Sequence, residues 1–310
     1  MALMRQVFLW ASRQAWLGDQ FRRRRFAQVA VRRFMPGEEV GSALEAALAV
    51  RPKGISTVLT QLGENITQLS EAKEVADHYR GVLDRIGPLG LDCQISIKLT
   101  QLGLDVSRDE ARQFVAALVK RAAELKNFVW IDMEDSSYVD ATLDLYRRVR
   151  AEHQNVGVCL QAYLRRTAAD LESLMAIGPS IRLVKGAYRE PASVVFPKKS
   201  DVDAEYLKLA RMLLKRVAGR PGTRVGFGTH DLRLVEQIVR DAQAAGVGKD
   251  AFELQMLFGI GREDQERLAA RGYRVRVLIS YGSYWFPWYM RRLAERPANV
   301  WLVVKSMLTG

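Results

Sequence analysis

The chain has 310 residues, of which 48% are hydrophobic and 26% charged, and its formal net charge is +12. This length and apolar content suffice for one large folded domain or two smaller ones, and they exclude a mainly disordered chain. The positive charge is compatible with an acidic partner such as nucleic acid, an anionic membrane or a phosphate-bearing ligand. Much of it is concentrated near the start of the chain: Arg5, Arg13, Arg22 to Arg25, Arg32 and Arg33.

Several classes of protein are disfavoured by composition. Cys93 and Cys159 lie in apolar segments, which favours buried free thiols in a reducing compartment over a disulfide. The three histidines are scattered, so we expect no metal site. No apolar run approaches the about 18 to 20 residues of a membrane-spanning helix, and arginines interrupt the apolar stretch that a secretory signal requires. We therefore expect a cytoplasmic protein.

Residues 1–50 predict a helical segment ahead of the main domain. Apolar residues recur there at helical spacing, beside a basic flank: Leu3, Val7, Trp10, Leu17 and Phe21. Such a helix can lie in the interface of an anionic bilayer, with its arginines at the headgroups. It can equally pack on the protein's own surface. Peripheral contact with the inner face of the cell membrane therefore stays an open prediction.

From residue 51 to 310, short apolar strands alternate with helical patterns. Strands are predicted at 55–61, 94–98, 128–132, 156–161, 181–185, 224–229, 252–257 and 275–279. Helices are predicted at 70–86, 107–126, 138–152, 167–177, 201–218, 231–245, 262–271 and 284–296. Capping boxes or close variants pair Ser42 with Glu45, Ser107 with Glu110, and Thr167 with Asp170.

Eight strands, each followed by a helix, predict an α/β fold in which residues 51–310 form one (β/α)₈ barrel. The rival is an open doubly wound sheet. That fold usually carries a glycine-rich turn after its first strand, and residues 61–65 read Gln-Leu-Gly-Glu-Asn instead. The barrel is therefore favoured.

In such a barrel the chemistry lies at the C-terminal ends of the strands. Those ends carry an unusual number of polar residues: Lys98, Asp132, Gln161, Arg182, Lys185, Thr229, His230, Asp231 and Gln255. Helix capping can explain one such ending, but not so many at one rim. We therefore expect a polar site at the mouth of the barrel.

The polar residues divide into two sets. Cations, amides and hydroxyls suit a phosphate-bearing cofactor with a heteroaromatic ring, and they come from Gln161, Arg182, Lys185, Thr229 and His230. A second set with both charges suits a zwitterion: Lys98, Asp132, Arg291 and Arg292. The paired arginines would bind a carboxylate, and Asp132 would hold an ammonium or accept its proton. Lys98 would keep Asp132 ionised by pairing with it.

Each assignment has a simpler alternative. Lys185 can serve as a Schiff-base lysine, as in barrel aldolases. Residues 132–135 can form an acidic cap on the next helix, and His230 with Asp231 can be a structural pair. The two arginines can form a solvated helix face. A non-enzymatic binder of nucleic acid or of a membrane surface, driven by the arginine clusters, is disfavoured, because base-stacking aromatics are not interleaved with the basic runs and no nucleic-acid motif is present.

Seven motifs together resemble the proline dehydrogenase family, and they run in order over roughly two-thirds of the chain. They are IKLTQLG at 97–103, IDMEDS at 131–136, LQAY at 160–163, RLVKGAY at 182–188, GTHD at 228–231, FELQMLFG at 252–259 and RRLAER at 291–296. The compact monofunctional bacterial form is the most similar, because no aldehyde dehydrogenase domain follows. The resemblance implies a distorted (β/α)₈ barrel with FAD at the strand C-termini and the last helix over the substrate.

The resemblance also implies roles for individual residues. Asp132 and Arg182 would be catalytic, with Arg182 near flavin N5. The flavin would be lined by Met133, Gln161, Arg182, Lys185, Gly186, Ala187, Thr229, His230 and Glu295. The substrate would be surrounded by Lys98, Asp132, Leu257, Arg291 and Arg292. The implied reaction is oxidation of L-proline to 1-pyrroline-5-carboxylate by hydride transfer to flavin N5, with electrons passed to a membrane quinone, as the first step of proline catabolism.

One position departs from the family pattern. The family usually has Tyr on the last strand, four positions before the glycine that corresponds to Gly282, and this chain has Leu278. Leucine retains an apolar contact with a substrate ring but supplies no hydroxyl. Hydroxyproline or another cyclic amine is therefore an alternative substrate, and Tyr281 or Tyr284 is a candidate to replace the missing hydroxyl.

Overall fold

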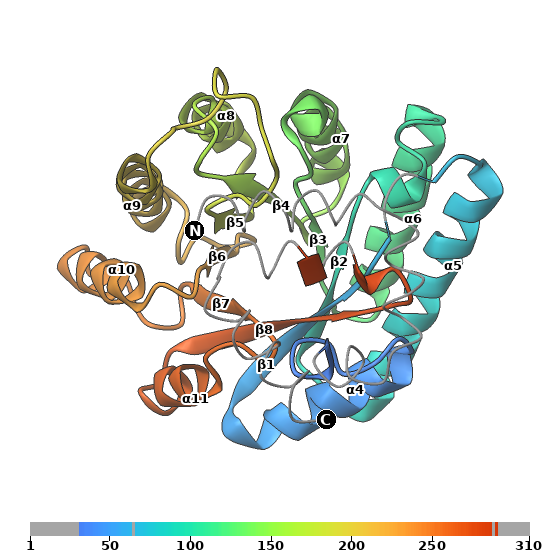
Figure 1. Ribbon diagram of the computed structural model, residues 1–310, viewed down its shortest axis with the longest axis horizontal. Helices are drawn as coiled ribbons and strands as arrows, with labels where there is room; N and C mark the ends of the chain where they lie inside the picture. The colour runs from blue at the N-terminus through green and yellow to red at the C-terminus, as the bar shows by residue number, and fades with distance from the viewer. Residues whose placement is uncertain (1–30, 64–65, 287–288, 291–310) are drawn as a thin grey trace, which may run out of the picture.

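The computed structural model describes residues 31–63, 66–286, 289 and 290. In this part of the chain, eight parallel strands form a closed barrel in sequence order, from β1 to β8. The ring closes where β8 pairs with β1, from Ile55 opposite Val275 to Gln61 opposite Tyr281. Figure 1 shows the strands as an inner ring with the helices outside it. The predicted (β/α)₈ barrel is confirmed.

The strands lie where the apolar runs predicted them. They are β1 (Ile55–Gln61), β2 (Cys93–Ile97), β3 (Val129–Ile131), β4 (Val156–Gln161), β5 (Ile181–Val184), β6 (Val225–Gly228), β7 (Glu253–Leu257) and β8 (Arg274–Tyr281). β1 and β4 match the prediction at both ends. The agreement has a physical cause, since a strand buried on both faces reads as an uninterrupted apolar run.

The outer helices are α4 (Val40–Val50), α5 (Leu69–Ile86), α6 (Arg108–Glu124), α7 (Val139–Glu152), α8 (Thr167–Leu174), α9 (Lys199–Arg216), α10 (Leu232–Ala244) and α11 (Arg262–Ala270). The cap of α6 is confirmed, because the Ser107 side chain accepts from the Glu110 amide. The other two predicted caps are wrong. Ser42 lies inside α4, and Thr167 donates its hydroxyl to the Gln161 carbonyl instead of capping α8.

The main core lies between the strands and the surrounding helices. Outward-facing strand residues such as Ile95 and Ile97 pack with Tyr79 and Leu83 of α5, and all four are fully buried. α4 belongs to the same core, to which it contributes Ala43, Leu44 and Ala47. The predicted helical segment 1–50 therefore includes a helix that packs on the barrel, whereas residues 1–30 lie outside the described part.

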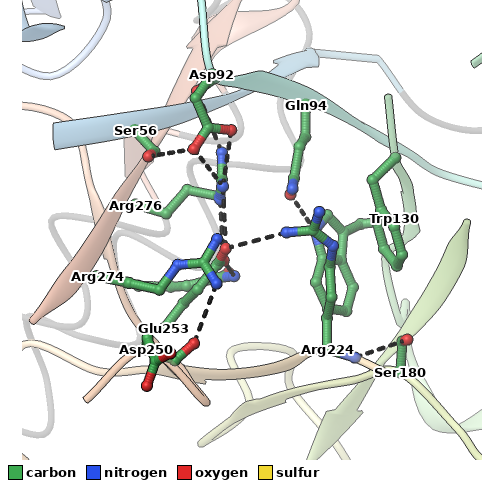
Figure 2. Close-up of polar contacts among 12 residues, drawn as sticks. Ser56, Asp92, Gln94, Trp130, Ser180, Arg224, Asp250, Glu253, Arg274 and Arg276 are labelled. Carbon is green, nitrogen blue, oxygen red and sulfur yellow. Dashed lines mark hydrogen bonds and ion pairs between the residues drawn. The ribbon is translucent and has the colours of Figure 1, made fainter. Parts of the chain in front are cut away.

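The inside of the barrel is polar at its N-terminal end. Arg276 is buried, and its guanidinium donates to Glu253 Oε2 at 2.9 Å, to Asp92 Oδ1 at 3.0 Å and to the Thr57 carbonyl at 2.7 Å. Figure 2 shows this ion pair with Arg224 beside it. Burial raises the pKa of Glu253, but the charge and hydrogen bonds of Arg276 outweigh burial and lower it overall. A paired carboxylate thus lies in the barrel beneath the mouth.

Candidate active site

Most of the predicted site residues lie at the C-terminal end of the barrel, on consecutive strands. They are Lys98 after β2, Asp132 and Met133 after β3, Gln161 at the end of β4, Arg182 within β5, Lys185 to Ala187 after β5, Thr229 and His230 after β6, Leu257 at the end of β7 and Leu278 within β8. Because the barrel is closed, these ends meet at one mouth.

Arg182 is the buried cation of this mouth. Its Nε donates to Gln255 Oε1 at 2.7 Å, and its Nη1 donates to Ser96 Oγ at 2.8 Å and to Asp132 Oδ1 at 2.9 Å. The guanidinium carbon lies 4.7 Å from the centre of the Trp130 ring, within range of a cation–π contact. Nη2 is buried and has no partner among the described residues. One nitrogen of a fixed guanidinium, with its two N–H groups, is therefore left for a ligand.

Asp132 is paired differently from the sequence prediction. Its carboxylate accepts from Ser96 Oγ at 2.8 Å as well as from Arg182. Lys98, the predicted partner, is half-buried and makes no ion pair with a described residue. Among the described residues, Asp132 therefore pairs with Arg182 and not with Lys98.

The β4 and β5 ends form a narrow wall. Gln161 Nε2 donates to the Met133 carbonyl at 3.2 Å, while Gln161 Oε1 is buried and has no partner in the described part. Gly186 has φ +109°, and a Cβ there would lie 2.1 Å from Cδ1 of Tyr163. Glu190 fixes the loop that follows, since it accepts from the Ser136 amide at 2.7 Å and from the Tyr163 hydroxyl at 3.2 Å. The wall thus offers the Gln161 amide oxygen, beside a glycine that makes room for the Tyr163 ring.

Lys185 belongs to a cluster of charges at the rim. Its Nζ lies 2.6 Å from Asp203 and 3.5 Å from Asp231. Lys199 contacts the same two carboxylates, and Arg233 lies 3.1 Å from Asp231. Three cations and two carboxylates leave the cluster with one net positive charge. That suits a phosphate-bearing ligand.

The β6 and β7 ends are joined by His230. Its Nε2 accepts from the Leu257 amide at 2.9 Å, so the ring proton of a neutral His230 lies on Nδ1. Thr229 is buried, and its hydroxyl accepts from the Asp231 amide at 3.1 Å. Both side chains thus have fixed orientations at the mouth.

Leu278 faces the inside of the barrel. It packs against a buried cluster of Val58, Phe128 and Trp130, and Trp130 also contacts Arg182. Tyr281 does not supply the hydroxyl that Leu278 lacks, since its oxygen lies 2.8 Å from His78 Nε2. Tyr284 is 52% exposed. Among the described residues, neither tyrosine is seen to replace the missing hydroxyl, and Leu278 offers only an apolar side chain at this position.

Comparisons with known proteins agree on one family. The model of the family described as "Proline dehydrogenase" matches residues 43–303. The chain is 40% identical to proline dehydrogenase of Deinococcus radiodurans, over 90% of both chains, and 36% identical to proline dehydrogenase 1 of Bacillus subtilis (strain 168), over 99% of both. The chain belongs to the proline dehydrogenase family. It is therefore an oxidoreductase of the class that acts on CH–NH donors.

Solved structures show the same fold. Proline utilization A (PutA) of Bdellovibrio bacteriovorus, inactivated by N-propargylglycine, matches 86% of this chain with a TM-score of 0.79 and 23% identity. A PutA with proline bound in remote sites matches 87% with a TM-score of 0.71 and 24% identity. This chain spans about a third of those PutA chains, 32% and 31%.

Three residues of the proline dehydrogenase motif near the C-terminus, Arg291, Arg292 and Glu295, lie outside the described residues. Their predicted roles stay predictions. In the described part of the chain, no group of three or more His, Cys, Asp or Glu is placed to hold a metal ion. No described helix is both long and apolar enough to cross a bilayer.

Sequence reasoning missed the residues that support the mouth from inside. Ser96 and Trp130 contact Arg182 and were not among the predicted residues, whereas Gln255, which also contacts Arg182, was predicted at the rim without a role. A signal was available, because side chains two residues apart on a strand share a face. Ser96 lies two residues before Lys98, and Trp130 lies two residues before Asp132. Their side chains are therefore expected on the same face as those predicted site residues.

Proposed function

We propose that this protein oxidises L-proline to 1-pyrroline-5-carboxylate at the mouth of the barrel, with FAD as the hydride acceptor. The observation that carries the proposal is the arrangement around Arg182. A buried guanidinium is fixed by Gln255, Ser96 and Asp132, and one nitrogen remains without a described partner. A buried donor of this kind is unfavourable unless a ligand accepts from it. Family membership supplies the substrate class.

The described residues fit a flavin. Arg182 Nη2 and Gln161 Oε1 offer an unpartnered donor and acceptor, which the edge of an isoalloxazine can match. Gly186 makes room for the Tyr163 ring beside these groups. The net positive cluster at Lys185 suits the pyrophosphate, and Met133, Ala187, Thr229 and His230 complete the proposed set with Glu295. When bound, FAD would supply a two-electron acceptor for hydride.

The remaining residues would prepare the substrate. Asp132, held in place by Arg182, would bind the substrate ammonium or take its proton. Loss of that proton leaves a neutral amine, whose lone pair stabilises the charge that develops as hydride departs. Lys98 would add a cation near the carboxylate, for which we propose Arg291 and Arg292 as the main ligands. Leu257 and Leu278 would cover the ring and fix its distance from the acceptor.

Two alternatives differ in their support. Leu278 favours tolerance of a ring-substituted or larger cyclic amine such as hydroxyproline, because it gives apolar contact without a hydroxyl. A Schiff-base lyase that uses Lys185 is disfavoured. Its Nζ lies 2.6 Å from Asp203 and 3.5 Å from Asp231, so it is engaged with two carboxylates and is not free to attack a carbonyl.

For the electron acceptor we propose a membrane quinone. The support is indirect, since it comes from the family resemblance and from the amphipathic pattern of residues 3–21, which lie outside the described part. Reduction of a soluble quinone analogue with proline as donor would test the acceptor. Co-sedimentation with anionic vesicles, compared with neutral ones, would test membrane contact at the inner face of the cell membrane. Binding that does not depend on lipid charge would contradict the electrostatic part of this proposal.

The visible spectrum of the purified protein tests the function most directly. We expect a flavin spectrum that bleaches when L-proline is added without oxygen, and a smaller response to 4-hydroxyproline. Arg182→Met should lower the rate of bleaching about tenfold or more, the effect of losing a hydrogen bond to a charged group. Arg211→Met is the matched control, because Arg211 is an exposed partner of Asp241 on the outer surface. A colourless protein trapped on Lys185 by borohydride would instead support the lyase.

A further inference from the structure

Gln255 joins Arg182 to the ion pair inside the barrel. Its Oε1 accepts from Arg182 Nε at 2.7 Å, and its Nε2 donates to Glu253 Oε2 at 2.9 Å. The same Glu253 oxygen accepts from Arg276 Nε at 2.9 Å. Gln255 and Glu253 are at most 5% exposed. A continuous series of hydrogen bonds therefore runs from the mouth to the N-terminal end of the barrel.

The orientation of the Gln255 amide is fixed by its neighbours. An ionised carboxylate can only accept hydrogen bonds, and a guanidinium can only donate them. The amide must therefore direct its nitrogen toward Glu253 and its oxygen toward Arg182. Because Arg276 holds Glu253 in place, the position of the oxygen is fixed as well.

Two glycines make room for the side chains that hold Arg182. A Cβ at Gly226 of β6 would lie 2.5 Å from Gln255 Nε2. A Cβ at Gly157 of β4 would lie 2.5 Å from Cζ3 of Trp130, whose ring lies under the guanidinium. These strands flank β5, which carries Arg182. The space on both sides of Arg182 is therefore filled by its supports.

We propose that Gln255 is a positioning residue for the reaction. It occupies Arg182 Nε and holds the guanidinium so that Nη2 is directed to the bound flavin. The inference rests on the proposed function, but it concerns a residue that does not itself contact substrate or cofactor. A correctly held cation stabilises the negatively charged reduced flavin, so its displacement should lower the midpoint potential as well as the rate.

The test compares substitutions at Gln255. Gln255→Met conserves the length and volume of the side chain but removes both of its hydrogen bonds. It should lower the midpoint potential of the bound flavin, which can be measured with redox dyes in the absence of proline. It should also slow flavin reduction by L-proline about tenfold or more. Gly226→Ala leaves the amide in the chain but displaces it, and it should shift both quantities in the same direction. This second variant decides the question if Gln255→Met does not fold.

Gln255→Glu is the conservative variant. The introduced carboxyl would lie beside Glu253, whose like charge favours its protonated form, and beside Arg182, whose cation favours its ionised form; it accepts from Arg182 in either form. A protonated carboxyl accepts from Arg182 and donates to Glu253, as the amide does. We expect a potential and a rate close to those of the wild type at neutral pH.

Asn155→Leu is the matched control for loss of an amide. Asn155 donates to the carbonyls of Val119 and Asn127 at the opposite end of the barrel, so its loss should lower stability without shifting the potential. A wild-type potential in both Gln255→Met and Gly226→Ala, or an equal shift in Asn155→Leu, would overturn the inference. A wild-type protein without flavin would overturn the proposed function instead. In that case a crystal structure of Gln255→Met would still test the inference, because an Arg182 guanidinium in the wild-type position would contradict a positioning role for Gln255.

Discussion

Nη1 of Arg182 lies 2.9 Å from Oδ1 of Asp132, and this ion pair joins the two residues for which catalytic roles were predicted. The Arg182 side chain is 4% exposed and that of Asp132 is 18% exposed. The cation is therefore enclosed, whereas part of the carboxylate remains open to a ligand. Ser96 donates to the same Asp132 oxygen, so among the described residues both donors contact Oδ1, and we expect a substrate ammonium to bind at Oδ2.

Asp132→Asn should lower kcat/KM for L-proline about tenfold or more, because a charge-assisted hydrogen bond to the substrate nitrogen becomes a neutral one. Asparagine preserves the shape and an acceptor for Ser96, so flavin content should be unchanged. Steady-state kinetics together with the visible spectrum would measure both. Asp241→Asn, which removes an exposed partner of Arg211, is the control. Equal kcat/KM in Asp132→Asn and wild type would exclude the proposed contact with the amine.

Leu278→Tyr should increase the preference for L-proline over 4-hydroxyproline by about tenfold, the scale of effect for a small change in pocket volume. Leu278 packs against the cluster that contains Trp130, and tyrosine would place a larger ring and a hydroxyl at this position. The ratio of kcat/KM values for the two substrates is the measurement. A ratio that does not change would mean that Leu278 does not line the substrate pocket.

Gly186→Ala should destabilise the protein by about 1 to 3 kcal/mol and reduce its flavin content, because alanine is strained at φ +109° and its Cβ would overlap the Tyr163 ring. Gly81→Ala is the matched control. Gly81 lies inside α5 with no atom within 4 Å of an added Cβ, so the change should stabilise by about 0.5 to 1 kcal/mol. Thermal unfolding and the ratio of flavin to protein absorbance would separate the two. Full flavin content in Gly186→Ala would show that the packing of Tyr163 on Gly186 does not support the flavin site.

Much of the barrel could be predicted from sequence, because each strand is a short apolar run and the helices between them have a clear period. Predicted helix starts were less reliable. Thr167 with Asp170 has the spacing of a capping box, but the Thr167 hydroxyl donates to the Gln161 carbonyl at the end of β4. The box that does form at α5 uses Gln68 and Glu71, and glutamine is not a usual cap. Tertiary contacts decide between such local choices.

The location of the candidate site could be predicted from the sequence, but the ion pairs between its residues could not. Polar strand ends located the mouth, since a closed barrel brings all such ends together. Lys98 and Arg182 are both cations near Asp132, and sequence contains no distance with which to choose between them. The structure pairs Asp132 with Arg182, because the inward-facing Ser96 and Gln255 hold that guanidinium in place.

The acid stability of the rim cluster should depend on Asp203. Burial alone raises the pKa of this carboxyl, but the hydrogen bonds and charges of Lys185 and Lys199 outweigh burial and lower it. Because the folded state holds this proton less tightly than the unfolded state, the stabilisation is fully present above about pH 4 and is lost as the pH falls through the lowered pKa. Asp203→Asn should therefore lose less stability than the wild type on acidification from about pH 5 to about pH 2.

Denaturant unfolding at several pH values would measure this difference. Lys208→Met is a suitable control, because Lys208 pairs with Glu205 on the same helix and does not contact the cluster. Parallel stability curves for Asp203→Asn and wild type below about pH 4 would show that the ion pair with Lys185 contributes nothing to folding.

Arg150→Met should lower stability by about 3 kcal/mol or more without changing kcat/KM. Arg150 is 2% exposed, and its guanidinium donates to the carbonyls of Gln154, Gly178 at 2.5 Å and Gly222 at 2.6 Å. These carbonyls precede β4, β5 and β6, so one cation links the starts of three neighbouring strands. Burial lowers the pKa of Arg150, which has no carboxylate partner among the described residues.

Methionine retains the apolar stem of Arg150 but leaves those carbonyls without their donor. The melting temperature should therefore fall by about 5 °C or more. Flavin content and kinetics at lower temperature should stay those of the wild type, because the linked loops lie at the opposite end of the barrel from the mouth. Arg148→Met is the control, since Arg148 forms an exposed pair with Asp144 on the same helix. Equal melting temperatures for the two variants would show that Arg150 does not hold the strand starts together.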